Sequence, residues 1–260
     1  MNKKFEHFGI YWDPRCCLPP INDLRSEDEK KHFHTTMSSI NTVIQRFDPL
    51  RLMLGAELAK QQFIFEKSKV SIATVMLTTD PKRHAYFTPK SNLCADISYN
   101  PLDLASLPKR HAEIGRLAIE LSERGLQKFS ELAEFPADFC RSVLRKFEEA
   151  DYTFSWEIGI RSIRTTKTRI SIFGTVNGGR TVCTLVVARE EDVIFRQEIW
   201  SVDDAKWQFA NRFKALSVLD GELIVGSPTD RLVGPCNIPV DELPLDVVDA
   251  IISKTGQLKS

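Results

Sequence analysis

The spacing of apolar residues along the chain predicts most of the helices in its N-terminal half. Ser26 and Glu29 form a capping box, which indicates that a helix begins there. Apolar residues then follow at alternating spacings of four and three: Phe33, Met37, Ile40, Ile44 and Phe47. Asp48-Pro49 predicts a second helix through about residue 60, and two later helical patterns begin at Pro108 and Pro136.

Short apolar stretches separate these helices. The stretches 8–12, 69–77 and 93–99 predict strands, and Tyr86-Phe87 predicts an extended segment. Gly125 lies inside the helical pattern that follows Pro108, where we interpret it as a kink or a break. The regular strand–helix alternation of a parallel sheet is not apparent in this pattern.

The C-terminal half changes to a period of two. Large apolar side chains alternate strictly from Tyr152 to Ile160, which puts them on one face of a strand. Asn177-Gly178-Gly179 and Asp220-Gly221 favour tight hairpins, because such turns need residues that tolerate a positive φ. Strands joined by tight turns pair antiparallel. We therefore expect a meander of about four strands from residue 152 to residue 200, extended by the Asp220-Gly221 hairpin. Helical patterns follow at 201–213 and from 244 onward.

These elements predict an α+β protein with an antiparallel meander sheet and flanking helices in the C-terminal half, and a mixed α/β N-terminal half. We expect a helical and short-strand region over 1–150 and an antiparallel sheet region with a C-terminal helix over 151–260, or one core shared by both.

Composition narrows the classes of function. Apolar residues make up 42% of the 260 residues and charged residues 27%, which is ordinary globular composition. The net charge of zero argues against a dedicated nucleic-acid binder. No apolar stretch approaches the roughly 20 residues that span a bilayer, and no secretory signal is evident. Six scattered cysteines indicate reduced thiols, so we expect a cytoplasmic protein.

Familiar catalytic and cofactor motifs are missing from the sequence. His32 and His34 would point apart on a helix, and the adjacent Cys16 and Cys17 cannot easily share one metal. We therefore predict no cofactor, no metal site and no defined catalytic residue. An enzyme of unfamiliar type remains an alternative, with a site assembled from distant residues: Cys94, His84, His111 and the arginines after Ile160.

Charge is distributed unevenly in the C-terminal half. Between Ile158 and Arg189 six basic residues occur without an acidic one: Arg161, Arg164, Lys167, Arg169, Arg180 and Arg189. This run is either a phosphate-binding patch or the solvated face of a hairpin. Seven acidic residues and one basic residue follow between Asp220 and Asp249. We predict that part of this acidic stretch contacts a protein partner: Asp220, Glu222, Asp241, Glu242 and Asp246.

Two short motifs resemble those of a known group of proteins. The opening Gly9-Ile10-Tyr11-Trp12-Asp13-Pro14-Arg15 fits Gly-x-Tyr-Trp-x-Pro-Arg, and Asp48-Pro49-Leu50 follows the first helix. This arrangement resembles bacterial immunity proteins of polymorphic-toxin systems, and it covers under a fifth of the chain. The resemblance implies a cytoplasmic inhibitor that binds a cognate toxin and has no chemistry of its own. The alternatives are the enzyme described above and a nucleic-acid-binding protein.

Overall fold

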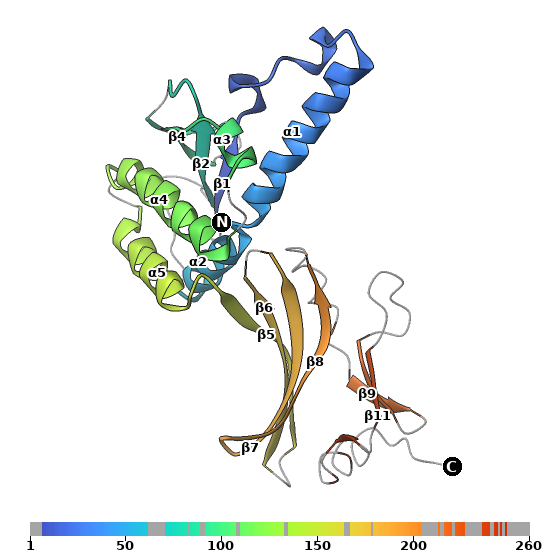
Figure 1. Cartoon of the computed structure of the whole chain (residues 1–260). Coiled ribbons are helices and arrows are strands. Elements are labelled where there is room, and N and C mark those ends of the chain that lie inside the picture. The colour runs from blue at the N-terminus through green and yellow to red at the C-terminus, as the bar shows by residue number, and fades with distance from the viewer. Residues whose placement is uncertain are drawn as a thin grey trace. The chain divides into compact units, whose positions relative to one another are not determined.

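The chain divides into two compact units, Met1–Phe154 and Ser155–Ser260 (Figure 1). Each unit has its own hydrophobic core. The boundary that the sequence predicts lies between residues 150 and 151. The computed structural model describes residues 7–61, 71–82, 84–88, 92–107, 110–132, 135–163, 167–177 and 179–203 of the chain. It also describes 213, 216–219, 222–226, 236–239, 242, 243, 245 and 248.

The first unit contains a four-stranded mixed sheet in the order β1-β2-β4-β3. Strands β1 (His7–Trp12), β2 (Ile72–Thr78) and β4 (Leu93–Ser98) pair in parallel, and β3 (Ala85–Phe87) pairs antiparallel to β4. The sequence shows no regular strand–helix alternation, yet three strands of this sheet are parallel. Two helices, rather than one, connect β1 to β2, so no simple strand–helix alternation marks the crossover.

One face of this sheet carries the core of the unit. Alternate residues of each parallel strand enter that core, for example Ile10, Val75 and Ala95, which are paired in register. Helix α4 (His111–Phe129) packs across β4, β2 and β1, whereas α2 (Asp48–Gln61) packs beside β1. Helix α5 (Ala137–Glu149) then packs on both helices.

Helix α1 (Glu27–Gln45) follows its sequence signal closely. It begins at the predicted capping box: Glu29 N donates to Ser26 Oγ at 3.1 Å and Ser26 N to Glu29 Oε2 at 2.9 Å. It packs on the short helix α3 (Leu102–Ala105). Two 3₁₀ turns, η1 (Pro14–Cys16) and η2 (Ile21–Asp23), precede it.

The second unit is built on antiparallel strands. β5 (Phe154–Ile163), β6 (Thr168–Val176), β7 (Thr181–Arg189) and β8 (Asp192–Val202) form one sheet in chain order, as predicted. Hairpin β9 (Leu216–Leu219)–β10 (Glu222–Val225) is confirmed, since Leu219 and Glu222 pair across the turn. It does not extend the meander. It forms a separate three-stranded sheet with β11 (Cys236–Pro239). In this sheet β10 is the central strand and pairs with β9 on one side and with β11 on the other.

The chain therefore has the α+β fold that its sequence predicts, with an antiparallel sheet in the C-terminal half and a mixed sheet with helices in the N-terminal half. The helices expected over 201–213 and after Pro244 fall largely outside the described residues. Within the part of the chain that the structure describes, no helix is long and apolar enough to cross a bilayer.

Candidate functional site

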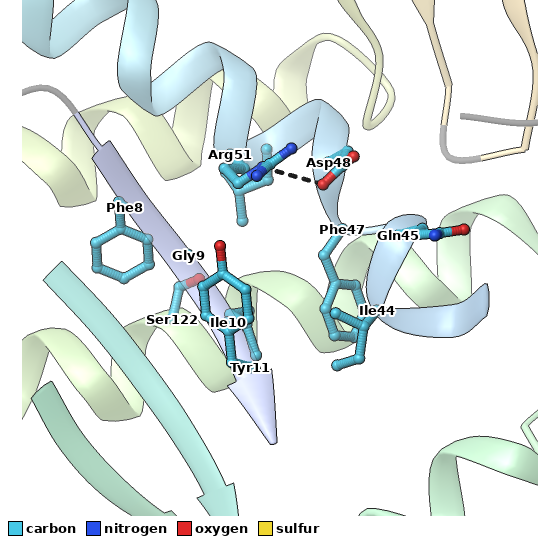
Figure 2. A pocket seen from close by; sticks show the side chains of 11 residues that line it. Phe8, Gly9, Ile10, Tyr11, Ile44, Gln45, Phe47, Asp48, Arg51 and Ser122 are labelled. Atoms are coloured by element: carbon cyan, nitrogen blue, oxygen red, sulfur yellow. Dashed lines mark ion pairs between the residues drawn. The ribbon is translucent and has the colours of Figure 1, made fainter. Parts of the chain in front are cut away.

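A cleft of about 260 Å³ opens beside β1, between this strand and the junction of α1 and α2 (Figure 2). One wall is β1 itself, from Phe8 to Tyr11. The other wall is the junction, which runs from Ile44 at the end of α1 to Arg51 in the first turns of α2. Ser122 of α4 also lines the cleft. Three segments that are far apart in the sequence thus form one concave site.

The cleft lies at an edge of the sheet, because β1 is a terminal strand. His7 N donates to Ser71 O at 3.1 Å, and Asp13 N donates to Leu77 O at 3.2 Å. Main-chain groups alternate in direction along a strand, so the odd-numbered residues of β1 face β2. The N–H and C=O groups of Phe8 and Ile10 consequently point away from β2. No described strand pairs with that edge of β1.

The far end of this edge is already occupied. Trp12 Nε1 donates to Asn41 Oδ1 of α1 at 2.9 Å, which ties the end of β1 to the helix. The stretch of this edge that no described strand pairs with is therefore short, covering Phe8 to Tyr11, and of its residues only Tyr11 is exposed. It coincides with the strand residues that line the cleft.

The α1–α2 junction contributes an ion pair to the cleft. Asp48 begins α2, where the positive end of the helix dipole favours a carboxylate, and Pro49 follows where its missing N–H costs no hydrogen bond. Arg51 Nε lies 3.0 Å from Asp48 Oδ1, one turn further along the helix, as Figure 2 shows. The pair adds a polar but overall neutral group to a wall that is otherwise mostly apolar.

Gly9 and Tyr11 form the strand wall together. A Cβ atom at Gly9 would lie 2.7 Å from Tyr11 Cε2, so the absence of a side chain at Gly9 lets the tyrosine ring lie against the strand. Residues two apart on a strand share a face, which explains this contact in the Gly-x-Tyr part of the opening motif. Tyr11 remains 44% exposed.

Ser122 is the most unusual polar group of the site. It is fully buried, and its Oγ has no hydrogen-bond partner among the described residues. A buried hydroxyl without a partner is costly, since it has lost its hydrogen bonds to water. The sequence motifs do not single out this residue. One signal in the sequence could have identified it. Ser122 is a polar residue one helical turn from Ala118 and from Leu126, which are both core residues, so it lies on the buried face of the helix.

A second hollow, of about 400 Å³, lies at the carboxyl ends of the parallel strands, the usual place for ligands in open α/β sheets. Its charged groups already have partners. Asp13 pairs with Arg15 at 2.9 Å, and Asp80 with Lys82 at 2.9 Å. Asp96, only 3% exposed, accepts a hydrogen bond from Tyr86 Oη at 3.2 Å. This satisfied arrangement gives less indication of a missing ligand than the cleft does.

The predicted partner-binding residues lie in the second unit, and only two of them belong to the described residues. Glu222 begins β10 and accepts a hydrogen bond from Asn237 Nδ2 of β11 at 2.8 Å. Glu242 is exposed. Asp220, Asp241 and Asp246 lie outside the described residues. The role of this acidic surface stays a prediction.

The histidines proposed for an unfamiliar enzyme do not converge. His84 Nε2 lies 2.8 Å from Glu131 Oε1, beyond the end of α4, whereas His111 begins α4 and lies 2.9 Å from Asp151 O. A helix of this length separates its ends by roughly 27 Å at 1.5 Å per residue. Cys94 is buried in β4 of the first unit, and the arginines after Ile160 belong to the second unit.

The cysteines with shifted ionisation favour the thiol over the reactive thiolate. Burial raises the pKa of Cys140 and of Cys183 to about 12. Burial and the neighbouring Cys16 raise the pKa of Cys17 to about 12 as well. These three thiols stay protonated at neutral pH, which disfavours them as nucleophiles. Among the described residues, no group of histidine, cysteine and carboxylate side chains has the geometry of a metal site, and His32 and His34 are both exposed.

The basic run is largely offset by carboxylates from adjacent strands and turns. Lys167 pairs with Glu190 at 2.7 Å. Arg169 pairs with Glu157 at 2.9 Å. Desolvation raises the pKa of the Glu157 carboxyl, but hydrogen bonds from Arg169 and Ser171 outweigh it, so that the pKa is lower than usual. Arg180 pairs with Glu198 at 2.8 Å. These pairs support the reading of the run as a solvated hairpin face. Arg161 and Arg164 have side chains outside the described set.

Comparison with protein-family models, with curated proteins and with solved structures found no match to this chain.

Proposed function

We propose that this chain is a protein-binding module, and specifically a cytoplasmic immunity protein that binds and neutralises a cognate toxin. The observation that carries the proposal is the meeting of two distant motifs at one cleft. Gly9, Ile10 and Tyr11 come from the opening motif. Asp48 and Leu50 come from the second motif, and they line the opposite wall.

The chemistry of the cleft also favours binding over catalysis. Its walls are mostly apolar, and its one ion pair is internally neutral. Apolar pockets with a few polar groups are typical anchor points for a partner's side chain, where much of the binding energy of an interface is concentrated. The charged groups that line the second hollow already have partners, and the histidines of the enzyme alternative lie near opposite ends of α4.

The test is a binding measurement with the protein encoded by the adjacent reading frame. The full chain is expected to form a tight one-to-one complex with that protein, measured by calorimetry and analytical ultracentrifugation. Tyr11→Ala removes an exposed wall of the cleft and is expected to weaken the complex by about tenfold or more, as truncation of an interface aromatic typically does. Phe87→Ala, at a 51% exposed aromatic on the opposite edge strand, is the matched control and should leave affinity unchanged.

Two further variants separate the cleft from the predicted acidic surface. Glu222→Lys and Glu242→Lys reverse the charges of that surface that the structure describes. If these variants weaken the complex and Tyr11→Ala does not, the contact face is the acidic surface and the cleft is not the site. If the neighbouring protein does not bind and native-cell pull-downs recover no stoichiometric protein, the proposed function is wrong.

A further inference from the structure

The floor of the cleft and its mouth differ in chemistry. Phe8, Ile10 and Leu50 line the cleft and are at most 7% exposed, so its floor is buried and apolar. Tyr11 and Gln45 line it as well, but both are exposed and mark the side that opens to solvent. A molecule that enters the cleft therefore exchanges water for apolar contacts at its inner end, which favours binding, and stays in contact with water at its outer end.

The volume of the cleft limits the size of such a molecule. Its 260 Å³ lies between the roughly 150 Å³ of a cavity that binds benzene and the roughly 300–1,000 Å³ that drug-sized ligands occupy. A single six-membered ring with one or two short substituents fits this space, whereas a drug-sized molecule does not.

Aromatic side chains lie on both walls of the cleft. Phe8 and Tyr11 come from β1, and Phe47 comes from the α1–α2 junction (Figure 2). Aromatic rings attract one another in edge-to-face and offset arrangements beyond the effect of burial alone. A flexible chain of similar size would also lose more conformational freedom on binding than a rigid ring does. The walls therefore favour a planar aromatic ring.

Ser122 identifies the polar group that the ring has to carry. Its hydroxyl is fully buried, lines the cleft and has no partner among the described residues, yet it can donate one hydrogen bond and accept two. A ligand without a polar group would leave this hydroxyl unpaired. A charged ligand would lose its hydration beside apolar walls without gaining an opposite charge of its own, because Arg51 already pairs with Asp48. An uncharged hydrogen-bonding group meets both conditions.

We propose that the cleft is a binding site for a small uncharged aromatic molecule, a single ring with one hydrogen-bonding substituent that pairs with Ser122. This inference goes beyond the proposed function, because it needs no protein partner. The ring and a partner's side chain would use the same space, so each would exclude the other. The competing occupant is a lone ordered water, which would satisfy Ser122 without filling the apolar part of the cleft.

The first experiment compares three probes of similar size on the full chain. p-Cresol carries a ring and a hydroxyl, toluene lacks the hydroxyl, and p-toluate carries a carboxylate in its place. p-Cresol is expected to bind with a Kd of about 1 mM or below, an ordinary affinity for so few atoms, and to shift the amide NMR signals of Gly9, Tyr11 and Ser122. Toluene should bind about two- to tenfold more weakly, the effect of one missing hydrogen bond. p-Toluate should not bind measurably.

The second experiment tests whether Ser122 is the group that distinguishes p-cresol from toluene. Ser122→Ala should bind p-cresol no more tightly than toluene, because the buried hydrogen-bond partner is gone. The same substitution should raise or preserve the midpoint of thermal unfolding, since it removes an unpaired buried hydroxyl. Ser171→Ala is the matched control. It removes a buried serine hydroxyl of the second unit and should leave the preference for p-cresol unchanged.

The outcomes are independent of the neighbour-encoded protein. The inference is overturned if p-cresol shifts no amide signal of the cleft at about 10 mM, tenfold above the expected Kd, in which case Ser122 holds at most a water. It is also overturned if toluene or p-toluate binds as tightly as p-cresol, or if the preference for p-cresol persists in Ser122→Ala. Failure of the probes leaves the proposed function standing, and binding of p-cresol as expected stands without a protein partner. If both proposals hold, p-cresol weakens the complex with the neighbour-encoded protein.

Discussion

Gly125 of α4 lies directly against Val75 of β2. A Cβ atom at this position would lie 2.2 Å from Val75 Cγ2, a distance that real Cβ atoms do not show. Helix α4 continues without interruption from His111 to Phe129, so Gly125 does not mark a break in the helix. The glycine is required by the approach of another element, which lies 50 residues away in the sequence and leaves no mark on the local pattern.

Gly125→Ala is expected to lower the free energy of unfolding by about 1–3 kcal/mol, the typical cost of overpacking a core. Helix propensity alone predicts the opposite, since Ala is favoured over Gly by about 1 kcal/mol inside a helix. Denaturant unfolding measures the difference. Gln127→Ala, at an exposed position of the same helix, is the matched control and should change stability by less than about 0.5 kcal/mol. A more stable Gly125→Ala protein would show that α4 and β2 are not in such close contact.

At the candidate site, too, the sequence indicates single residues but not which distant residues they contact. Tyr11, Asp48 and Leu50 belong to motifs that the sequence singles out, and they line the cleft. Nothing in the sequence indicates that these motifs meet, because each is local and the meeting depends on the path of α1. Ser122 is one polar residue in a helical pattern, and only its burial without a partner distinguishes it from the polar residues on the exposed face.

At the scale of elements, local signals identified strands, helices and the partners of strands that tight turns connect, but not the pairing of strands far apart in the sequence. The capping box of α1, the start of α2 and the hairpin at residues 177–179 are determined by neighbouring residues, and all three form as predicted. The parallel pairing of β1 with β2 joins segments about 60 residues apart, and the separate sheet of β9, β10 and β11 also depends on a third, later strand. Such long-range choices are decided by packing rather than by local propensity.

The capping box gives a prediction at this scale. Ser26→Ala removes the side-chain oxygen that accepts from Glu29 N, and should lower the free energy of unfolding of the first unit by about 1 kcal/mol. Ser38→Ala lies on the exposed interior of α1 and is the control, expected to be neutral or slightly stabilising because Ala is the better helix former. Circular dichroism followed through a denaturant titration measures both. Equal effects of the two substitutions would argue against a structural role for the cap.

The cap also responds to pH in a direction that can be checked. Hydrogen bonds from the Ser26 and Arg25 backbone lower the pKa of the Glu29 carboxyl below its usual value. A carboxyl with a lowered folded-state pKa stabilises the fold above its unfolded pKa, and this contribution is lost as the pH falls through the folded value. Glu29→Gln should therefore lessen the dependence of helix stability on pH in the acidic range, as seen by amide exchange in the first turn of α1. An unchanged dependence would contradict the role of Glu29 in the box.

At the scale of the whole molecule, each unit has its own core, and each core contains one strongly shifted thiol. Cys140 is fully buried in the core of Met1–Phe154, and Cys183 is fully buried in the core of Ser155–Ser260. Burial raises the pKa of each from 9.0 to about 12. Between pH 9 and about pH 12, each folded thiol keeps the proton that the same thiol releases in the unfolded chain. Rising pH therefore favours unfolding, and both units should lose stability as the pH rises from about 9 towards 12.

Measuring denaturant unfolding at pH 7, 9 and 10 tests this coupling in each unit separately. Cys140→Ala should lessen the alkaline loss of stability in the first unit, where the raised pKa of Cys17 still contributes, and leave that of the second unchanged. Cys183→Ala should lessen the loss in the second unit only, where the raised pKa of Cys236 still contributes. Val143→Ala, in the same core as Cys140, is the control: it creates a cavity without removing a titrating group, so it should lower stability equally at every pH. If Cys140→Ala and Val143→Ala give parallel pH profiles, ionisation of the buried thiol does not contribute to alkaline unfolding. If either cysteine variant changes the pH dependence of unfolding in both units, the two units unfold in one cooperative transition. The division of the chain into two compact units would then not correspond to two independent unfolding transitions.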